Sequence, residues 1–168
     1  ARLVFMVIER DVGSEKKVLT SFLIVNWNGK GLLKEYLKSL RSQSGQSFEV
    51  DLVDNGSSDG SARFVLEHFP EVRLVQLNEN KGFAGGNNAG LEHCSGKYIA
   101  LLNNDAELNP NWLCQMLEVL ERRPDVGFCS SRILVKGTSV LDTVGDRFTT
   151  AFTGTKLGEH QSEKLFDA

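Results

Sequence analysis

The chain has 168 residues, of which 40% are hydrophobic and 24% are charged, and its formal net charge is -3. This length suits one domain with a sizeable core, and the composition is that of an ordinary globular protein. A weakly acidic chain lacks the basic surface of nucleic-acid-binding proteins, so we expect no nucleic acid partner. An anionic ligand would need a cation or helix N-termini to supply positive charge.

The chain opens at Ala1 with an apolar run over residues 3–8, which is too short to span a bilayer. We expect it to be a strand or the tail of an upstream domain, and the start at Ala1 indicates a fragment or a processed chain. No transmembrane segment is expected. Cys94, Cys114 and Cys129 have no metal-ligand spacing and are predicted to be reduced, partly buried thiols. They favour a cytoplasmic location, with any contact to the inner face of the membrane made through a missing region or a partner.

From residue 18 onward, short β-rich runs alternate with amphipathic stretches. Strands are predicted at 18–25, 48–53, 72–77, 97–102 and 126–135, and helices at 29–42, 58–69, 84–93 and 110–123. In the last helix, Asn109 is the expected N-cap and Pro110 lies in the first turn. This alternation predicts an α/β fold with a mostly parallel sheet and helices on both faces.

The periodicity fades after about residue 137, where we expect loops and one short strand near 147–152. The chain is therefore divided into an N-terminal extension at 1–17, a core at 18–136 and a less regular part at 137–168.

Polar residues follow three of the predicted strands: 26–29 after the first, 54–60 after the second, and Asn103, Asn104 and Asp105 after the fourth. The carboxyl ends of parallel strands meet at one edge of a sheet, where ligands bind. Two carboxylates and several amides at that edge suit a divalent cation bound together with a phosphate-bearing ligand. Asp105 offers a hard oxygen to Mg2+ or Mn2+, although the Asn-Asn-Asp run is also typical of a plain turn.

Asp54 has two open interpretations. A fixed carboxylate at a strand end can accept a hydrogen bond from the imide N–H of uracil or thymine. Alternatively, residues 54–60 form a turn in which Ser58 or Asp59 caps the next helix.

The glycine-rich segment 81–90 lacks the spacing of dinucleotide-binding and P-loop motifs. It is either a flexible basic loop that opens a helix toward an anion, or a turn whose glycines supply positive φ. Trp27 and Trp112 are interpreted as packing residues. No role is assigned to His68, His93 or His160.

Four ordered segments, at 24–29, 53–61, 80–87 and 101–105, together resemble family 2 glycosyltransferases, in particular the rhamnosyltransferase-like branch that builds bacterial surface polysaccharides. The resemblance implies a GT-A fold, Rossmann-like, and an inverting transfer of a sugar from a nucleoside diphosphate to an acceptor hydroxyl. It implies a UDP- or dTDP-sugar as donor and a glycan or a lipid-linked molecule as acceptor.

The same resemblance assigns roles to residues. Val25 and Asn26 border the nucleobase, Asp54 contacts the pyrimidine, and Lys81 with the loop from Gly82 to Asn87 lies near the ribose and diphosphate. Asn103, Asn104 and Asp105 take the place of the Asp-x-Asp motif, with Asp105 as the carboxylate that binds Mg2+ or Mn2+. The full set of predicted nucleotide-sugar-binding residues is Val25, Asn26, Asp54, Asn55, Lys81, Gly82, Asn87, Asn103 and Asn104.

The sequence departs from the family pattern in two ways. Asn103 replaces the first carboxylate of the motif, so we expect metal and nucleotide to bind cooperatively. The general base of the family lies in a later acidic segment, which none of Asp142, Asp146, Glu159, Glu163 and Asp167 resembles. We expect the base beyond Ala168, so that 18–136 is the nucleotide-sugar-binding core and 137–168 an incomplete start of the acceptor side.

Two alternatives stay open. A sugar nucleotidyltransferase has a similar fold but needs a glycine-rich basic loop directly after the first strand, which residues 26–30 do not provide. A non-catalytic nucleotide-binding or assembly module would share the pocket without the transfer activity.

Overall fold

The computed structural model describes residues 4–7, 19–45, 47–144, 146–148, 154–158 and 160–162. The chain divides into two compact units between Cys129 and Ser130. Within the described residues, no helix combines the length and the apolar character needed to cross a membrane.

A six-stranded sheet in the order β4-β3-β2-β5-β1-β6 forms the centre of the first unit. Three of its pairings are parallel, as predicted, and they join β4 to β3, β3 to β2 and β2 to β5. The opening apolar run forms a strand that pairs antiparallel with β5. The strands are β1 (Val4–Val7), β2 (Thr20–Asn26), β3 (Phe48–Asn55), β4 (Arg73–Leu77), β5 (Tyr98–Asn103) and β6 (Phe128–Ser130). The predicted mostly parallel α/β sheet is confirmed.

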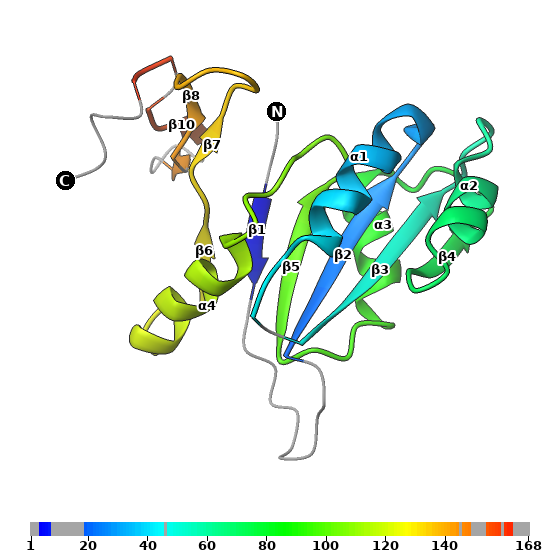
Figure 1. Ribbon diagram of the computed structural model, residues 1–168, viewed down its shortest axis with the longest axis horizontal. Coiled ribbons are helices and arrows are strands. Elements are labelled where there is room, and N and C mark those ends of the chain that lie inside the picture. Colours follow the sequence, from blue (N-terminus) through cyan, green and yellow to red (C-terminus); the bar gives the residue numbers. More distant parts are fainter. Residues whose placement is uncertain are drawn as a thin grey trace. The chain divides into compact units, whose positions relative to one another are not determined.

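Helices cover both faces of this sheet, as predicted, and Figure 1 shows α1 in front of the strands and α3 behind them. The helices are α1 (Lys30–Arg41), α2 (Ser61–His68), α3 (Gly82–Leu91) and α4 (Trp112–Arg122). Successive side chains of a strand point to opposite faces. Leu23 therefore packs toward α3, in a buried cluster with Val53, Cys94 and Ile99, whereas Phe22 packs against Trp112 of α4.

Two helices begin later than the sequence predicted. α2 starts at Ser61 rather than at residue 58, because Gly60 has φ +81° and cannot belong to a right-handed helix. α4 starts at Trp112 with Asn111 as N-cap, because Asn109 forms a turn in which its Oδ1 accepts the N–H of Asn111. On α2, Leu66 is exposed to solvent.

The predicted fifth strand at 126–135 is replaced by two short strands, β6 and β7 (Ile133–Leu134), which belong to different sheets. The polar residues Ser130, Ser131 and Arg132 interrupt the apolar run, and β6 ends at the first of them. In the second unit, β7 pairs with β8 (Leu141–Thr143) and β9 (Asp146–Phe148) pairs with β10 (Gly154–Lys156). This part is thus more regular than predicted, and the expected strand near 147–152 starts at Asp146. Residues 149–153 lie outside the described residues, as do Glu159, Glu163 and Asp167.

None of the three cysteines forms a disulfide among the described residues, and two of them are shielded as predicted. Cys94 is buried, Cys129 is half-buried, and Cys114 is exposed on α4.

Candidate functional site

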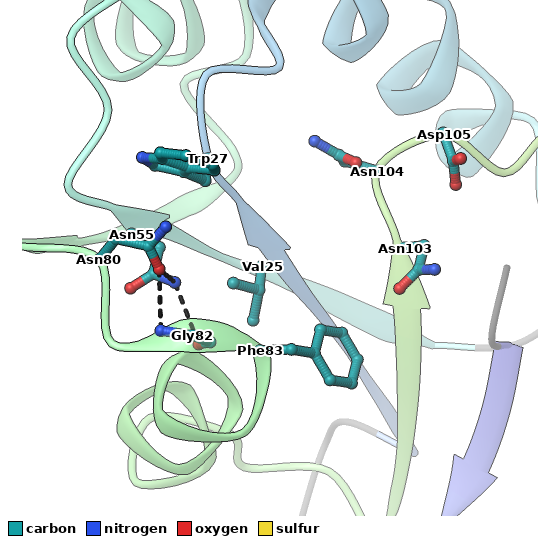
Figure 2. Close-up of a pocket in the computed structure, with 9 residues that line it drawn as sticks. All are labelled: Val25, Trp27, Asn55, Asn80, Gly82, Phe83, Asn103, Asn104 and Asp105. Atoms are coloured by element: carbon teal, nitrogen blue, oxygen red, sulfur yellow. Dashed lines mark hydrogen bonds between the residues drawn. The ribbon is translucent and has the colours of Figure 1, made fainter. Parts of the chain in front are cut away.

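A pocket of about 320 Å³ lies at the carboxyl edge of the parallel strands in the first unit. Figure 2 shows its lining residues, which come from the ends of β2, β3 and β5 and from the start of α3. They are Val25, Trp27, Asn55, Asn80, Gly82, Phe83, Asn103, Asn104 and Asp105. Segments that are far apart in the sequence therefore meet at the edge where the strand order predicts a ligand.

Two exposed aromatic side chains border this pocket. Trp27 is 56% exposed and Phe83 is 47% exposed, although large aromatic side chains are usually buried. In Figure 2 they project from two different elements, with Val25 between them. Their open π-faces suit a flat ring that stacks on them. The interpretation of Trp27 as a packing residue is therefore wrong, whereas Trp112 is buried against Phe22 as predicted.

Asn55 holds the glycine-rich loop against the sheet. Its side chain is 2% exposed, and its Oδ1 accepts the N–H of Lys81 at 2.9 Å. Its Nδ2 donates to Asn80 Oδ1 at 3.0 Å and to the carbonyl of Gly82 at 3.1 Å. Asn80 Oδ1 also accepts the N–H of Gly82 at 2.8 Å, as Figure 2 shows. The start of α3 is thus fixed by one buried amide.

The glycines of α3 serve mainly to bring the helix close to the sheet. Only Gly82 of this segment has a left-handed φ, at +70°. A Cβ on Gly86 would lie 2.7 Å from Val25 Cγ1, and one on Gly90 would lie under 3.0 Å from Leu23 and Val53. The alternative of a plain turn with positive-φ glycines therefore accounts for Gly82 alone.

The Asn103–Asp105 segment supplies two amides and a carboxylate to the pocket. The two asparagines are half-buried and Asp105 is exposed. Burial, together with the charge of Asp105, raises the pKa of the Tyr36 hydroxyl on α1 well above its usual value. Among the described residues, no three His, Cys, Asp or Glu side chains are grouped so that they could hold a metal ion. The segment therefore offers an open set of oxygens, not a closed metal cage.

Asp54 lies beside the pocket but does not line it. It is 4% exposed, and strand alternation turns its side chain away from the face that carries Asn55. Its Oδ1 is buried without a hydrogen-bond partner among the described residues. Only β2 separates β3 from β5, so the backbones that carry Asp54 and Asp105 end about 10 Å apart at the same edge. The contact of Asp54 with a pyrimidine stays a prediction.

Three other predicted residues also stand outside the lining set of described residues. Asn26 is fully buried and bonded to Asn104 and Ser57. Asn87 is buried, and its Nδ2 donates to the carbonyl of Phe83 at 2.9 Å, so it supports the aromatic residue from within α3. Lys81 is exposed and precedes the helix. The structure therefore brings together Val25, Asn55, Gly82, Asn103, Asn104 and Asp105, and adds Trp27, Asn80 and Phe83.

Asp59 forms the turn that the alternative interpretation gave to this loop, but the N-cap of α2 is Gly60 and neither Ser58 nor Asp59. Its Oδ1 accepts the N–H of Ser61 at 2.9 Å, and its Oδ2 accepts the N–H of Lys30 at 2.9 Å. Although partial burial acts in the opposite direction, these hydrogen bonds lower the pKa of Asp59 below its usual value. The carboxylate of Asp59 thus accepts a hydrogen bond from the first N–H group of α1, that of Lys30.

Residues 21–166 match the family described as "Glycosyl transferase family 2". Among individual proteins, the chain is 32% identical over 99 residues to the Rhizobium meliloti "Succinoglycan biosynthesis protein ExoO". The matched region covers 58% of this chain and 28% of that protein. It is 28% identical over 131 residues to the Bacillus subtilis "Putative teichuronic acid biosynthesis glycosyltransferase TuaG", which covers 75% of this chain and 52% of that protein. The chain thus spans between about a quarter and a half of the length of these two relatives.

Solved structures with the same fold include S. aureus TarS in complex with UDP, with a TM-score of 0.59 and 22% identity. The match covers 64% of this chain and 33% of that one. The mannosyltransferase PcManGT from Pyrobaculum calidifontis, solved with GDP-Man and Mn2+, has a TM-score of 0.57 and 25% identity. It covers 66% of this chain and 35% of that one.

Proposed function

Because this chain belongs to glycosyl transferase family 2 and has the GT-A fold, we propose that its pocket binds a nucleoside-diphosphate sugar, which serves as donor for an inverting glycosyl transfer in surface polysaccharide or glycan synthesis. The observation that carries the proposal is the pocket itself. It combines two exposed aromatic rings with an Asn-Asn-Asp segment at the carboxyl edge of the sheet. The rhamnosyltransferase-like branch stays a prediction.

The two sides of the pocket suit the two ends of such a donor. Trp27 and Phe83 offer π-faces to a nucleobase, which stacks well on aromatic side chains. Asn103, Asn104 and Asp105 offer oxygens and amide N–H groups to the phosphates and to their counter-ion. UDP- and dTDP-sugars are the proposed donors, and the neighbours solved with UDP and with GDP-Man support a nucleotide sugar in this fold.

The residues present fit a divalent cation that is shared with the ligand. Mg2+ and Mn2+ prefer oxygen ligands and commonly bind through one or two carboxylates together with substrate phosphates. Asp105 would supply the carboxylate, because it is exposed in the pocket and stands beside the amides of Asn103 and Asn104. Such a cation, when bound, neutralises negative charge on a departing diphosphate.

The chain's own residues orient the donor. Asn55 fixes the loop that carries Gly82, and Asn87 Nδ2 donates a hydrogen bond to the backbone carbonyl of Phe83. An inverting transfer also needs a base that removes the proton of the acceptor hydroxyl. Asp105 is the single carboxylate that lines the pocket among the described residues, and we assign it to the cation. The proposal therefore places the general base and the acceptor site outside this pocket.

The loop after β2 does not support the sugar nucleotidyltransferase alternative. Residues 26–30 form hydrogen bonds with the loop after β3, and the N–H of Lys30 donates to Asp59. This loop is therefore not an open phosphate cradle. The module without transfer activity shares the same pocket, and activity of a longer chain that is lost in Asp105→Ala would exclude it.

A thermal-shift panel tests the proposed function. UDP-, dTDP- and GDP-sugars are added with Mn2+ or with EDTA, and ADP serves as a non-donor control. At a ligand concentration 100 times Kd, binding adds about 2.7 kcal/mol to the free energy of unfolding. For a chain of this size this corresponds to a rise of about 5–10 °C in the melting midpoint. A rise with one donor class in Mn2+ is expected, and no rise with any nucleotide sugar would contradict the proposal.

A further inference from the structure

Two partly buried hydrogen bonds of Asn26 connect the strand ends at the edge of the sheet that carries the pocket. Asn26, the last residue of β2, is fully buried, and its Oδ1 accepts a hydrogen bond from Asn104 Nδ2 at 2.7 Å. Its Nδ2 donates to Ser57 Oγ at 3.4 Å. These two contacts join the ends of three strands, because Asn104 follows β5 and Ser57 follows β3. The oxygen-bearing side of the pocket is thereby connected to its aromatic side.

The backbone on both sides of Trp27 is held by the same contacts. Asn26 precedes Trp27, and the next residue, Asn28, has a left-handed φ of +51°. The N–H of Asn28 donates to Ser57 Oγ at 2.9 Å, and its Oδ1 accepts the N–H of Ser58 at 2.8 Å. The exposed indole of Trp27 is therefore positioned through its neighbours, not through its own packing.

Gly29 leaves room for the hydrogen bond between Asn26 and Asn104. Its φ of -109° is open to any residue, so no conformational reason requires glycine here. A Cβ at this position would lie under 3.0 Å from both Asn104 Nδ2 and Asn26 Oδ1, which is closer than real Cβ contacts. A side chain at position 29 therefore has to push the two amides apart.

We propose that Asn26 is a positioning residue whose hydrogen bond to Asn104 couples the two sides of the donor pocket. The inference rests on the proposed function. A buried amide that loses its partner is costly, so the intact bond keeps the Asn103–Asp105 segment in a fixed position relative to Trp27. A ligand that touches both sides gains affinity from this pre-organisation, whereas a ligand that touches one side gains little. Loss of the bond should weaken UDP binding much more than uridine binding.

The variant Gly29→Ala breaks the bond without removing a polar group, and Gly31→Ala is its matched control. Gly31 lies two residues further along, in α1, and a Cβ there would meet no heavy atom of the described residues within 4 Å. Binding of UDP and of uridine is measured by calorimetry in Mn2+ for both variants and for the unchanged chain. We expect Gly29→Ala to weaken UDP binding about tenfold, or about 1.4 kcal/mol, and uridine binding less than about twofold. Gly31→Ala should leave both affinities unchanged.

Asn26→Ala removes the same acceptor by a different route and replaces Gly29→Ala if that variant fails to fold. It should show the same selective loss for UDP. Equal losses for UDP and uridine, or no loss of UDP affinity, would overturn the coupling while leaving nucleotide binding intact.

A measurement without ligand separates this inference from the proposed function. The chain has two tryptophans, of which Trp112 is buried, so mobility seen in tryptophan emission comes mainly from Trp27. Asn26→Ala should lower the fluorescence anisotropy relative to the unchanged chain and to Gly31→Ala. An unchanged anisotropy would overturn the coupling. If the unchanged chain binds neither UDP nor uridine, the proposed function fails, and the anisotropy still decides whether Asn26 holds Trp27 in place.

Discussion

Trp27→Ala should weaken ligand binding and leave the stability of the fold nearly unchanged. More than half of Trp27 is exposed, so removing its side chain creates no buried cavity and disturbs little packing. Substitutions at exposed positions usually change the free energy of unfolding by less than about 0.5 kcal/mol. Loss of one base–aromatic stack costs about 1–3 kcal/mol, which corresponds to a rise in Kd of about 5- to 150-fold.

The assay is calorimetric titration of UDP in Mn2+, together with a melting curve for each variant. Trp27→Phe keeps a π-face and should bind UDP within about threefold of the unchanged chain. Leu32→Ala removes an apolar side chain of similar exposure, 50%, from α1 outside the pocket and should not affect binding. If Trp27→Ala binds UDP within twofold of the unchanged chain, the stacking role is refuted.

Three further changes test the framework around the pocket. Asn55→Ala leaves the N–H of Lys81 and the carbonyl of Gly82 without their buried partner, and should lower the free energy of unfolding by about 1–3 kcal/mol in urea titrations; a loss below 0.5 kcal/mol would contradict this. Gly90→Ala overpacks α3 against the sheet and should lower the free energy of unfolding by about 1–3 kcal/mol. Gly31→Ala, on an open helix face, should raise it by up to about 1 kcal/mol. Equal changes in the two variants would show that α3 does not need its close approach to the sheet. Burial raises the pKa of the Asp51 carboxyl above its usual value of 3.8, although the charge of Arg73 acts in the opposite direction. The folded chain therefore binds the proton of Asp51 more tightly than the unfolded chain does. The free energy of unfolding should fall as the pH rises from the unfolded-state pKa to the folded-state pKa. Asp51→Asn does not titrate, so its stability relative to the unchanged chain should improve from about pH 4 to pH 7 in urea titrations; a constant difference would refute the assignment.

The architecture of the first unit could be predicted because its signals are local. Apolar β-rich runs that alternate with amphipathic helices leave few arrangements other than a parallel sheet, and the carboxyl ends of its strands then share one edge. The strand ends therefore predicted Asn55 and Asp105 at a common edge without any knowledge of the strand order, whereas Val25 was predicted from the family resemblance. The starts of α2 and α4 were predicted too early. They depend on the left-handed φ of Gly60 and on the turn that Asn109 forms, and the residue types alone do not reveal either feature.

The individual roles of the site residues depend on packing, which a sequence alone does not specify. Trp27 resembles a core residue by composition, but it follows the last residue of β2, where the chain leaves the sheet and the indole points into the pocket. The sequence left a plain turn open for the segment that contains Gly86 and Gly90, and the close approach of α3 to the sheet explains these two glycines instead. Asn26 and Asp54 look like ligand contacts because they are polar strand-end residues, yet both are buried outside the pocket lining of the described residues. Alternation along the strand would have predicted this for Asp54, given that Asn55 faces the pocket.

The proposed function depends on a pocket in which a nucleoside diphosphate and a divalent cation occupy the same site through Asp105. Calorimetric titration of Mn2+ into the chain, with and without saturating UDP, measures this directly, with Asp105→Ala as the comparison. We expect Mn2+ to bind much more tightly when UDP is present, because a single pocket carboxylate needs phosphate oxygens beside it, and we expect Asp105→Ala to abolish the difference. Equal Mn2+ affinity with and without UDP, or an unchanged difference in Asp105→Ala, would contradict the shared site for the cation and the diphosphate at Asp105.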